Sequence, residues 1–318
     1  MPSTKITAKT SASQTKISKS TSKSTSSEST PKDQPGFIFG NSADADGNSL
    51  PPDSSFEDDT PKGLDGYDDR YIAFVDILGF KELIYKSVSD PNSVGALISA
   101  LDIAPKSPTI VLEEVNVSEQ DVDLRLHTFS DFVVASTKPT HGGLGVLAFV
   151  IWQLSNSWLS SRLLCRGGIA RGQVLHRATD GEVPPMVFGP AFVEAYQLES
   201  TVADFPRVIL SKTVRNDWNE YSKSGKLGEK LPLLIQRCQD GPNCVDTFCH
   251  LKRDGFDLVS SELPMETKQM QQALMHHLDD TAENPATHRK ALWLAKKFNV
   301  AVLHSRYGDL KIDIDDGD

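Results

Sequence analysis

Residues 71–80 read YIAFVDILGF, a run that is apolar except for Asp76 and that changes to helical spacing after Gly79. This pattern predicts a buried strand, a tight turn and the start of a helix. A carboxylate inside a buried strand is costly unless a cation or several hydrogen-bond donors compensate it. The backbone N–H groups that open the helix would face Asp76 and any phosphate bound beside it.

A second stretch, LHTFSDFVVA at residues 126–135, also places one carboxylate, Asp131, among apolar residues. It predicts a hairpin over Leu124–Ser136 that turns near Ser130 and Asp131. Taken singly, Asp76 could cap the helix that follows it, and Asp131 could be an ordinary turn residue. Two carboxylates at matching positions suggest instead that they share one cation.

The chain after residue 66 mixes strand and helix patterns, which indicates an α+β fold in one domain. The expected further strands are Thr109–Val115, Leu163–Val174, Pro206–Ser211, Leu233–Gln236, Thr247–Leu251 and Phe256–Val259. The expected further helices are Val94–Leu101, a long amphipathic one over Gly145–Leu164, one from about Pro190 to Glu199, and Glu266–Leu278 and His288–Phe298. The Gly-rich residues 141–145 lack a following Lys-Ser/Thr, so they read as a lead-in to a helix and not as a phosphate loop.

Residues 1–66 are rich in Ser, Thr, Lys, Pro, Gly and Asp and contain no apolar run that could form a core, so we expect a disordered tail. The tail is basic in its first half and acidic in its second, and it lacks the apolar stretch of a secretory signal. A transit peptide and a tail that docks on a partner are alternatives to a solvated tail. We expect the folded domain, with a C-terminal helical extension, over residues 67–305 and an acidic tail over residues 306–318.

Composition excludes several classes of protein. No stretch approaches the roughly 18 apolar residues of a membrane span, so we expect a soluble protein. The four cysteines are too few and too clustered for a disulfide framework, which suits a reducing cytoplasm. Cys238, Cys244, Cys249 and His250 lack the paired spacing of common zinc sites, and Asp240–Pro242 predicts a hairpin turn between two strands. The net charge of −10 argues against non-specific binding of nucleic acid.

Four sequence blocks follow one another in the folded region. They are Phe-x-Asp-Ile-x-Gly-Phe at 74–80, Ser-Asp at 130–131, Arg-x-Gly-Ile-x-x-Gly-x-Val at 166–174 and Gly-x5-Ala-x-x-Leu-Glu at 189–199. In this order they resemble the catalytic domain of class III nucleotidyl cyclases. A closer resemblance is to the bacterial Pycsar pyrimidine cyclases, and LWLAKKFN at 292–299 extends it to most of the folded chain. The resemblance implies a ferredoxin-like βαββαβ core with extra strands and C-terminal helices.

The implied reaction makes a 3′,5′-cyclic monophosphate, in which the ribose 3′-hydroxyl attacks its own α-phosphate and pyrophosphate leaves. Two divalent cations would lower the pKa of the hydroxyl and spread the charge on the leaving phosphates. By the resemblance, Asp76 and Asp131 would bridge two Mg²⁺ or Mn²⁺ ions, with the backbone carbonyl of Ile77 on the second. The turn Leu78–Phe80, with Gly79 at its centre, would offer N–H groups to the β- and γ-phosphates, so Leu78, Gly79 and Phe80 are candidate substrate-binding residues.

The positions that read the base depart from the purine cyclases. His127 stands four residues before Asp131, where purine cyclases carry Lys or Glu, and Pro190, Val193 and Gln197 stand where the resemblance places Asp, Asn and Arg. A base edge left unpaired on desolvation weakens binding, so the site should not favour adenine or guanine. We expect a pyrimidine triphosphate, UTP ahead of CTP, although His127 could donate or accept a hydrogen bond.

Because Gln197 replaces the expected arginine, Arg166 and Arg171 are the nearest candidates to stabilise charge on the transferred phosphoryl group. Each could instead pair with a surface acid. The resemblance implies a symmetric homodimer in which both chains complete each site, and a role in antiphage defence in which the product activates a separately encoded, cyclic-nucleotide-gated effector. The alternatives are a cyclase fold that has lost catalysis and senses a nucleotide, and a purine cyclase.

Overall fold

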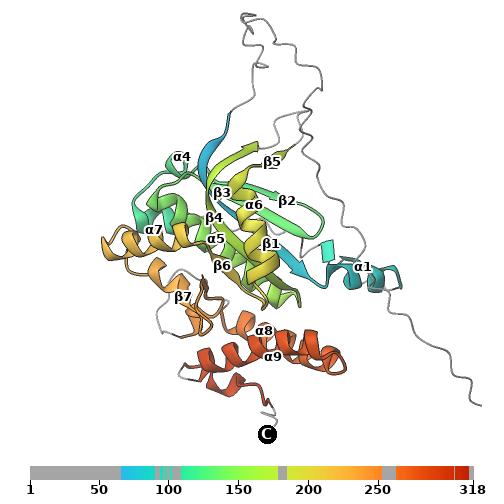
Figure 1. Cartoon of the computed structure of the whole chain (residues 1–318). Helices are drawn as coiled ribbons and strands as arrows, with labels where there is room; N and C mark the ends of the chain where they lie inside the picture. Colours follow the sequence, from blue (N-terminus) through green and yellow to red (C-terminus); the bar gives the residue numbers. More distant parts are fainter. Residues whose placement is uncertain are drawn as a thin grey trace, which may run out of the picture. The chain divides into compact units, whose positions relative to one another are not determined.

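The computed structural model describes residues 66–89, 94–95, 97–98, 101, 109–177, 185–252, 263–303 and 305–314. The predicted tail over residues 1–66, apart from Gly66, and the predicted strand Phe256–Val259 lie outside the described residues. Residues 60–318 make one compact unit, built around an eight-stranded sheet. Helices cover this sheet, so the α+β class is confirmed (Figure 1).

The predicted strand around Asp76 is β1 (Asp68–Leu78), which lies inside the sheet. Its antiparallel neighbours are β3 (Phe132–Thr137) and β4 (Leu164–Arg177), and β2 (Arg125–Thr128) pairs with β3 as the predicted hairpin. A helical connection joins β1 to β2, and α5 (His141–Ser160) joins β3 to β4. The order β2-β3-β1-β4 with these connections is the expected ferredoxin-like βαββαβ core.

The extra strands extend the sheet beyond β4 in the order β6-β8-β7, and β5 pairs with the far end of β4. β6 runs parallel to β4, whereas the other pairs are antiparallel. These strands are β5 (Met186–Phe188), β6 (Val208–Leu210), β7 (Ile235–Arg237) and β8 (Asn243–Val245).

The helices divide between the two faces of the core sheet because alternate residues of β1 point to opposite sides. Tyr71, Ala73, Val75 and Ile77 join the larger apolar cluster with α5, whereas Ile72 and Phe74 join a smaller one with α6 (Pro190–Gln197). Below, the two sides are called the α5 face and the α6 face. Asp76 lies two residues after Phe74, so its side chain points to the same side of the sheet, the α6 face.

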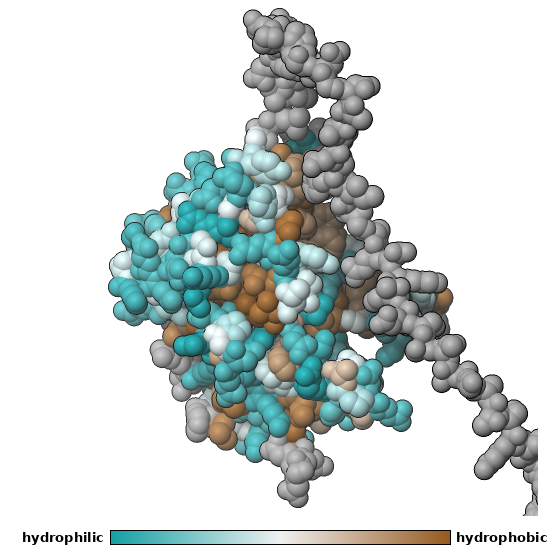
Figure 2. Space-filling view, in the orientation of Figure 1, coloured by the Kyte–Doolittle hydropathy of each residue, from teal (hydrophilic) through white to brown (hydrophobic). Residues whose placement is uncertain are grey.

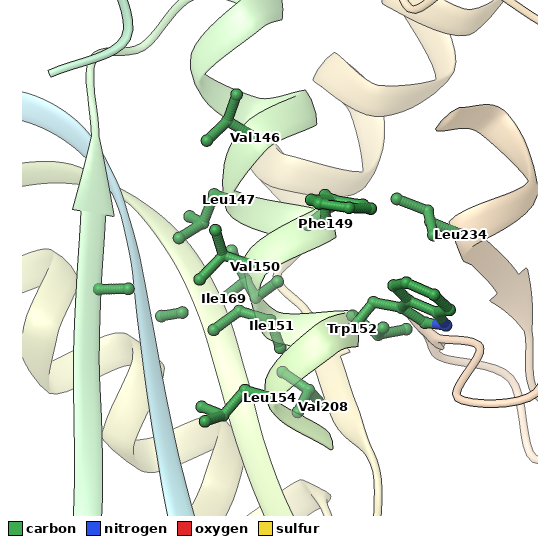
Figure 3. Close-up of a cluster of buried hydrophobic side chains, with 14 of the residues drawn as sticks. Val146, Leu147, Phe149, Val150, Ile151, Trp152, Leu154, Ile169, Val208 and Leu234 are labelled. Atoms are coloured by element: carbon green, nitrogen blue, oxygen red, sulfur yellow. The ribbon is translucent and has the colours of Figure 1, made fainter. Parts of the chain in front are cut away.

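α5 is buried on nearly all sides and not only along one stripe. Figure 3 shows why: Leu147, Val150 and Leu154 point toward the strands, while Phe149 and Trp152 point the opposite way toward Leu234. The prediction of an amphipathic helix was therefore wrong in this respect. The helix also begins four residues earlier than predicted, at His141, so the Gly-rich lead-in forms its first turn.

Thr109–Val115, predicted as a strand from its β-branched start, is the helix α3. Val111, Leu112 and Val115 are buried while Glu113 is exposed, which is the spacing of a helix face and not of a strand. The packing of this face against α5 outweighs the local β propensity. Within the predicted helix Val94–Leu101, the described positions are helical.

A strand was also predicted for Thr247–Leu251, and this prediction is wrong as well. The last three residues of this segment form a short 3₁₀ helix, Cys249–Leu251, with three residues between it and the end of β8. Leu233 and Leu234 likewise belong to a 3₁₀ turn, so the predicted strand there begins only at Ile235. The sequence analysis did not expect the short helix α4 (Glu119–Val122) or the polar helix α7 (Lys212–Lys223).

The C-terminal helices are α8 (Leu263–Thr281) and α9 (Pro285–Val302), and they contain both predicted helical segments. The fold continues past residue 305 because Tyr307 and Ile312 pack into the apolar cluster of these helices. The side chain of Asn299 holds this segment through two hydrogen bonds of 2.8 Å to the backbone of Ile312. None of the described helices combines the length and apolar character that a membrane crossing requires.

The hairpin of β7 and β8 turns at Asp240–Pro242 as predicted, and a disulfide joins Cys238 to Cys244 across it. The disulfide was not predicted, although the predicted turn at Asp240–Pro242 lies between these two cysteines. Cys165 and Cys249 are free and buried.

Candidate active site

Asp76 lies near the C-terminal end of β1, between the two neighbouring strands. Its register partners are Phe132 on β3 and Arg166 on β4. Three residues later the chain leaves the sheet at Gly79, whose φ of +73° is a backbone conformation that residues with a Cβ rarely adopt. The helix α1 (Phe80–Ser89) starts at once, so strand, turn and helix follow one another as the sequence predicts.

Asp131 lies in the turn between β2 and β3, directly beside the end of β1. The backbone N–H of Ile77 donates to the backbone oxygen of Asp131 at 2.9 Å. The carboxylate of Asp131 accepts a hydrogen bond from the Ser130 hydroxyl at 2.8 Å. The hairpin therefore brings the two predicted carboxylates to one corner of the sheet, although they are 55 residues apart in the sequence.

The carboxyl of Asp76 is half-buried, and its pKa is raised to about 6. Burial is the largest cause, and the negative charges of Glu199 and Asp131 add to it, while Arg166 opposes them. A carboxyl whose pKa is raised by burial and by neighbouring carboxylates is a candidate for a functional site, and a cation beside it would favour its ionised form. Among the described residues, Arg166 alone opposes this rise in the pKa of Asp76.

Glu199 is a third acidic residue that the sequence analysis did not single out. It is buried, it belongs to the π-helical turn Leu198–Val202 that continues α6, and it forms an ion pair with Arg166. Burial raises its pKa although Arg166 opposes this. The sequence did indicate Glu199 as the last residue of the block at 189–199. Its pairing with Arg166, however, depends on the packing of α6 against β4.

The residues present fit a divalent cation held by two carboxylates and a phosphate. Mg²⁺ in particular is usually bound by one or two carboxylates together with the phosphates of a substrate. Asp76 and Asp131 supply the two carboxylates at one corner, and the raised pKa of Asp76, caused by burial first and by the charges of Glu199 and Asp131 next, favours a cation there. Over the residues that the structure describes, no group of three or more His, Cys, Asp or Glu could hold a metal ion by itself.

The two candidate arginines lie on opposite faces of the sheet. Arg166 is on the α6 face, next to Asp76 in the register, and pairs with Glu199. Arg171 is five residues further along β4 and points to the α5 face, where it bonds Asp69 at 2.9 Å and Asp217 at 2.8 Å. Within one chain, therefore, only Arg166 is brought to the carboxylate corner.

His127 is on β2 with Val134 as its register partner, and Val134 in turn opposes Phe74. His127 therefore shares the α6 face with Asp76, and their Cα atoms are about 12 Å apart from strand spacing and rise. Burial lowers its pKa. Its Nδ1 lies 2.7 Å from Nε2 of His176, a buried residue of β4 that the sequence analysis did not identify.

Aromatic rings fill the α6 face between His127 and α6. Phe74 packs against Phe132, Phe192 and Tyr196 at centroid distances of 4.9, 5.9 and 5.4 Å, and Phe129 stacks on Phe132 at 4.6 Å. Flat apolar surfaces of this kind suit a planar ring as a ligand.

Three of the four positions at which the sequence was found to depart from the purine cyclases fall together on one side of α6. Pro190, Val193 and Gln197 are spaced three and four residues apart and are all exposed. Within one chain they face solvent, as does Tyr196, half of whose surface is exposed. Hydrophobic residues also gather near the centre of the face on which α6 lies in Figure 2.

No protein-family model matches the sequence, and no curated protein matches it. Among solved structures, the guanylyl cyclase Cya2 is similar at 12% identity and a TM-score of 0.34, over 57% of this chain and 91% of that one. The adenylyl cyclase CyaB from P. aeruginosa is similar at 14% identity and a TM-score of 0.35, over 56% of this chain and 92% of that one. With scores of this size, the function proposed below rests on the residues of the site.

Proposed function

We propose that the protein is a metal-dependent nucleotide cyclase that converts a pyrimidine nucleoside triphosphate, UTP ahead of CTP, to the 3′,5′-cyclic monophosphate and pyrophosphate. The observation that carries the proposal is the convergence of Asp76 and Asp131 beside the turn at Gly79. A carboxylate pair next to a helix start offers negative ligands for cations and N–H groups for phosphates in one place.

In the proposed reaction the 3′-oxygen bonds to the α-phosphorus, the bond from that phosphorus to the leaving pyrophosphate breaks, and the hydroxyl proton passes to solvent. Asp76 and Asp131, with the carbonyl of Ile77, would hold Mg²⁺ or Mn²⁺, which when bound lowers the pKa of the hydroxyl and neutralises the phosphates. The N–H groups of the turn around Gly79 orient the phosphates. When a bound substrate competes with Glu199 for Arg166, the guanidinium donates hydrogen bonds to the oxygens of the transferred phosphoryl group and stabilises their charge.

The choice of a pyrimidine rests on what the α6 face offers. Pro190 and Val193 lie on the exposed side of α6, where they would meet a base in a site shared with a second chain, and their side chains offer no polar atom to the edge of a purine. Across the α6 face, the rings of Phe74 and Phe132 leave His127 as the polar side chain at the expected base position. A purine would bury polar edge atoms without partners, and such a loss weakens binding by about tenfold or more.

We further propose that the enzyme acts as a homodimer. The exposed side of α6 supports this, because Val193 and Tyr196 are an apolar and an aromatic residue left about half exposed, at 49% and 50%. As the sequence resemblance implies, the cyclic nucleotide would serve as a second messenger in antiphage defence, acting on a separately encoded effector.

The test is to incubate the purified protein with each of the four nucleoside triphosphates and Mn²⁺ and to identify the products by mass spectrometry. We expect cyclic UMP as the main product, with less cyclic CMP. A product from ATP or GTP alone would show a purine cyclase. Binding of a nucleotide without any product would show a sensing module.

A further inference from the structure

A chain of buried polar side chains runs across the α6 face and ends at His127. It starts at Asp123, which bonds Arg70 at 2.8 Å, and continues from Arg70 Nε to the Ser136 hydroxyl at 2.9 Å. Ser136 Oγ lies 2.7 Å from Nδ1 of His176, and Nε2 of His176 lies 2.7 Å from Nδ1 of His127. Arg70, Ser136 and His176 are each at most 2% exposed.

The direction of these hydrogen bonds follows from the arginine at the inner end. A guanidinium only donates, so Ser136 Oγ accepts from Arg70. In the described part of the chain, Ser136 Oγ has just one other partner, Nδ1 of His176. Ser136 therefore donates to Nδ1, neutral His176 carries its proton on Nε2, and His176 donates to Nδ1 of His127. Neutral His127 is left with its proton on Nε2.

If Nδ1 of His176 donated to Ser136 instead, the hydroxyl proton of this fully buried serine would have no acceptor, which folded proteins rarely tolerate. A charged His176 is also disfavoured, because burial and the nearby charges of Arg70 and Arg125 lower its pKa to about 3. The backbone oxygen of His176 accepts from Arg125, which holds the residue in place.

The outer nitrogen of His127 is free to meet a ligand. Within the described residues, no hydrogen bond involves its Nε2, and the side chain is partly exposed on the same face as Asp76. His127 and Asp76 share this face, with their Cα atoms about 12 Å apart, so a nucleotide held by its α-phosphate at Asp76 would meet His127 if its base lies along the face. The atom that His127 presents to the base is then an N–H donor.

Resting on the proposed function, we propose that the chain Arg70–Ser136–His176 fixes His127 as a hydrogen-bond donor and so selects uracil over cytosine. Uracil carries a carbonyl at the ring position where cytosine carries an amino group, so a fixed donor matches the first and opposes the second. His176 is the positioning residue, since it acts on the base only through His127.

The tautomer is tested without any substrate, by long-range ¹H–¹⁵N correlation spectra of the ¹⁵N-labelled full chain at pH 7.5. We expect the proton of His127 on Nε2 in the unchanged protein and in His176→Gln, whose amide can accept from Ser136 and donate to His127. In His176→Leu the donor is gone, and we expect a mixture of both tautomers. His141→Gln, on the α5 face, is the matched control and should leave the His127 signals unchanged.

Selectivity is tested by the dissociation constants of UTP and CTP, measured by calorimetry with Ca²⁺ so that turnover is not needed. We expect UTP to bind roughly tenfold or more tightly than CTP to the unchanged protein and to His176→Gln, and the ratio to fall to about threefold or less in His176→Leu. If His176→Leu is poorly folded, Ser136→Ala removes the preceding donor and should lower the ratio likewise.

A His127 proton on Nδ1 in the unchanged protein would overturn the proposal, as would a UTP:CTP ratio that His176→Leu and Ser136→Ala leave unaltered, or binding of neither nucleotide. Failure of the proposed function is a separate outcome: UTP would bind selectively, with the Nε2 tautomer, and yet yield no cyclic product with Mn²⁺.

Discussion

Burial, together with the negative charges of Glu199 and Asp131, disfavours the ionised form of Asp76. Its pKa in the folded protein, about 6, lies above the value of 3.8 for an unperturbed aspartate. Ionised Asp76 therefore lowers the free energy of unfolding, fully above pH 6 and not at all below about 3.8. Discounted for the water that reaches this half-buried group, the effect is about 1 kcal/mol, or a few degrees in Tm.

We therefore predict that Asp76→Asn raises Tm by about 2–4 °C at pH 7.5 in EDTA, and that the difference disappears near pH 4. Differential scanning fluorimetry measures both. Asp279→Asn, at an exposed position of α8, should leave Tm unchanged at either pH. A lower Tm for Asp76→Asn at pH 7.5 would show that the carboxylate stabilises the metal-free fold.

Replacing Arg166 and replacing Arg171 should have different effects on the kinetics. Arg166→Ala removes the guanidinium beside Asp76, and we predict a fall in kcat of about 100-fold with a smaller change in KM. Arg171→Ala removes two ion pairs on the other face, so Tm should fall while kcat stays within about threefold. An equal loss of kcat in both variants would contradict the separation and would place Arg171 in a site as well.

At the scale of single elements, α5 depends on a close approach at its first turn. A Cβ on Gly143 would come within 2.1 Å of the backbone oxygen of Lys138, and neither backbone can move easily, because Thr140 caps the helix and Thr137 bonds the Gly143 oxygen. We predict that Gly143→Ala lowers the free energy of unfolding by about 2–4 kcal/mol in urea titrations. Ser157→Ala, less buried on the same helix, should change it by less than about 0.5 kcal/mol; equal effects would contradict the account.

The elements that the sequence predicted well are those whose pattern agrees with their final packing. β1 and β3 were found because their apolar runs are also largely their buried residues. α3 was misread because its β-branched residues favour a strand locally, whereas its packing on α5 decides for a helix. α7 was missed because its sequence is mostly polar and only Val214 and Trp218 are buried.

The site was predictable where it depends on local sequence and not where it depends on topology. Asp76, Gly79 and Asp131 each sit in a recognisable local pattern. Glu199 pairs with Arg166, and His176 contacts His127. Only the folding of the sheet and the packing of α6 bring these partners together. No spacing along the chain encodes those contacts.

At the scale of the whole molecule, the exposed side of α6 is the expected contact between two chains. We predict by light scattering a mass twice the 34.8 kDa of one chain. Val193→Glu should give the monomer and abolish activity, while Asn219→Glu, an equally exposed neutral residue on α7, should leave the dimer intact. An active monomer would show that one chain holds a whole site.

The central claim is that Asp76 and Asp131 together hold the cations for cyclisation of a nucleotide. The most direct measurement is the initial rate of cyclic UMP formation from UTP and Mn²⁺ by Asp76→Asn and Asp131→Asn, with Asp279→Asn at an exposed position of α8 as control. We predict that each aspartate variant loses at least about 1000-fold in rate while the control stays near the unchanged protein. Full activity of either aspartate variant would contradict the claim.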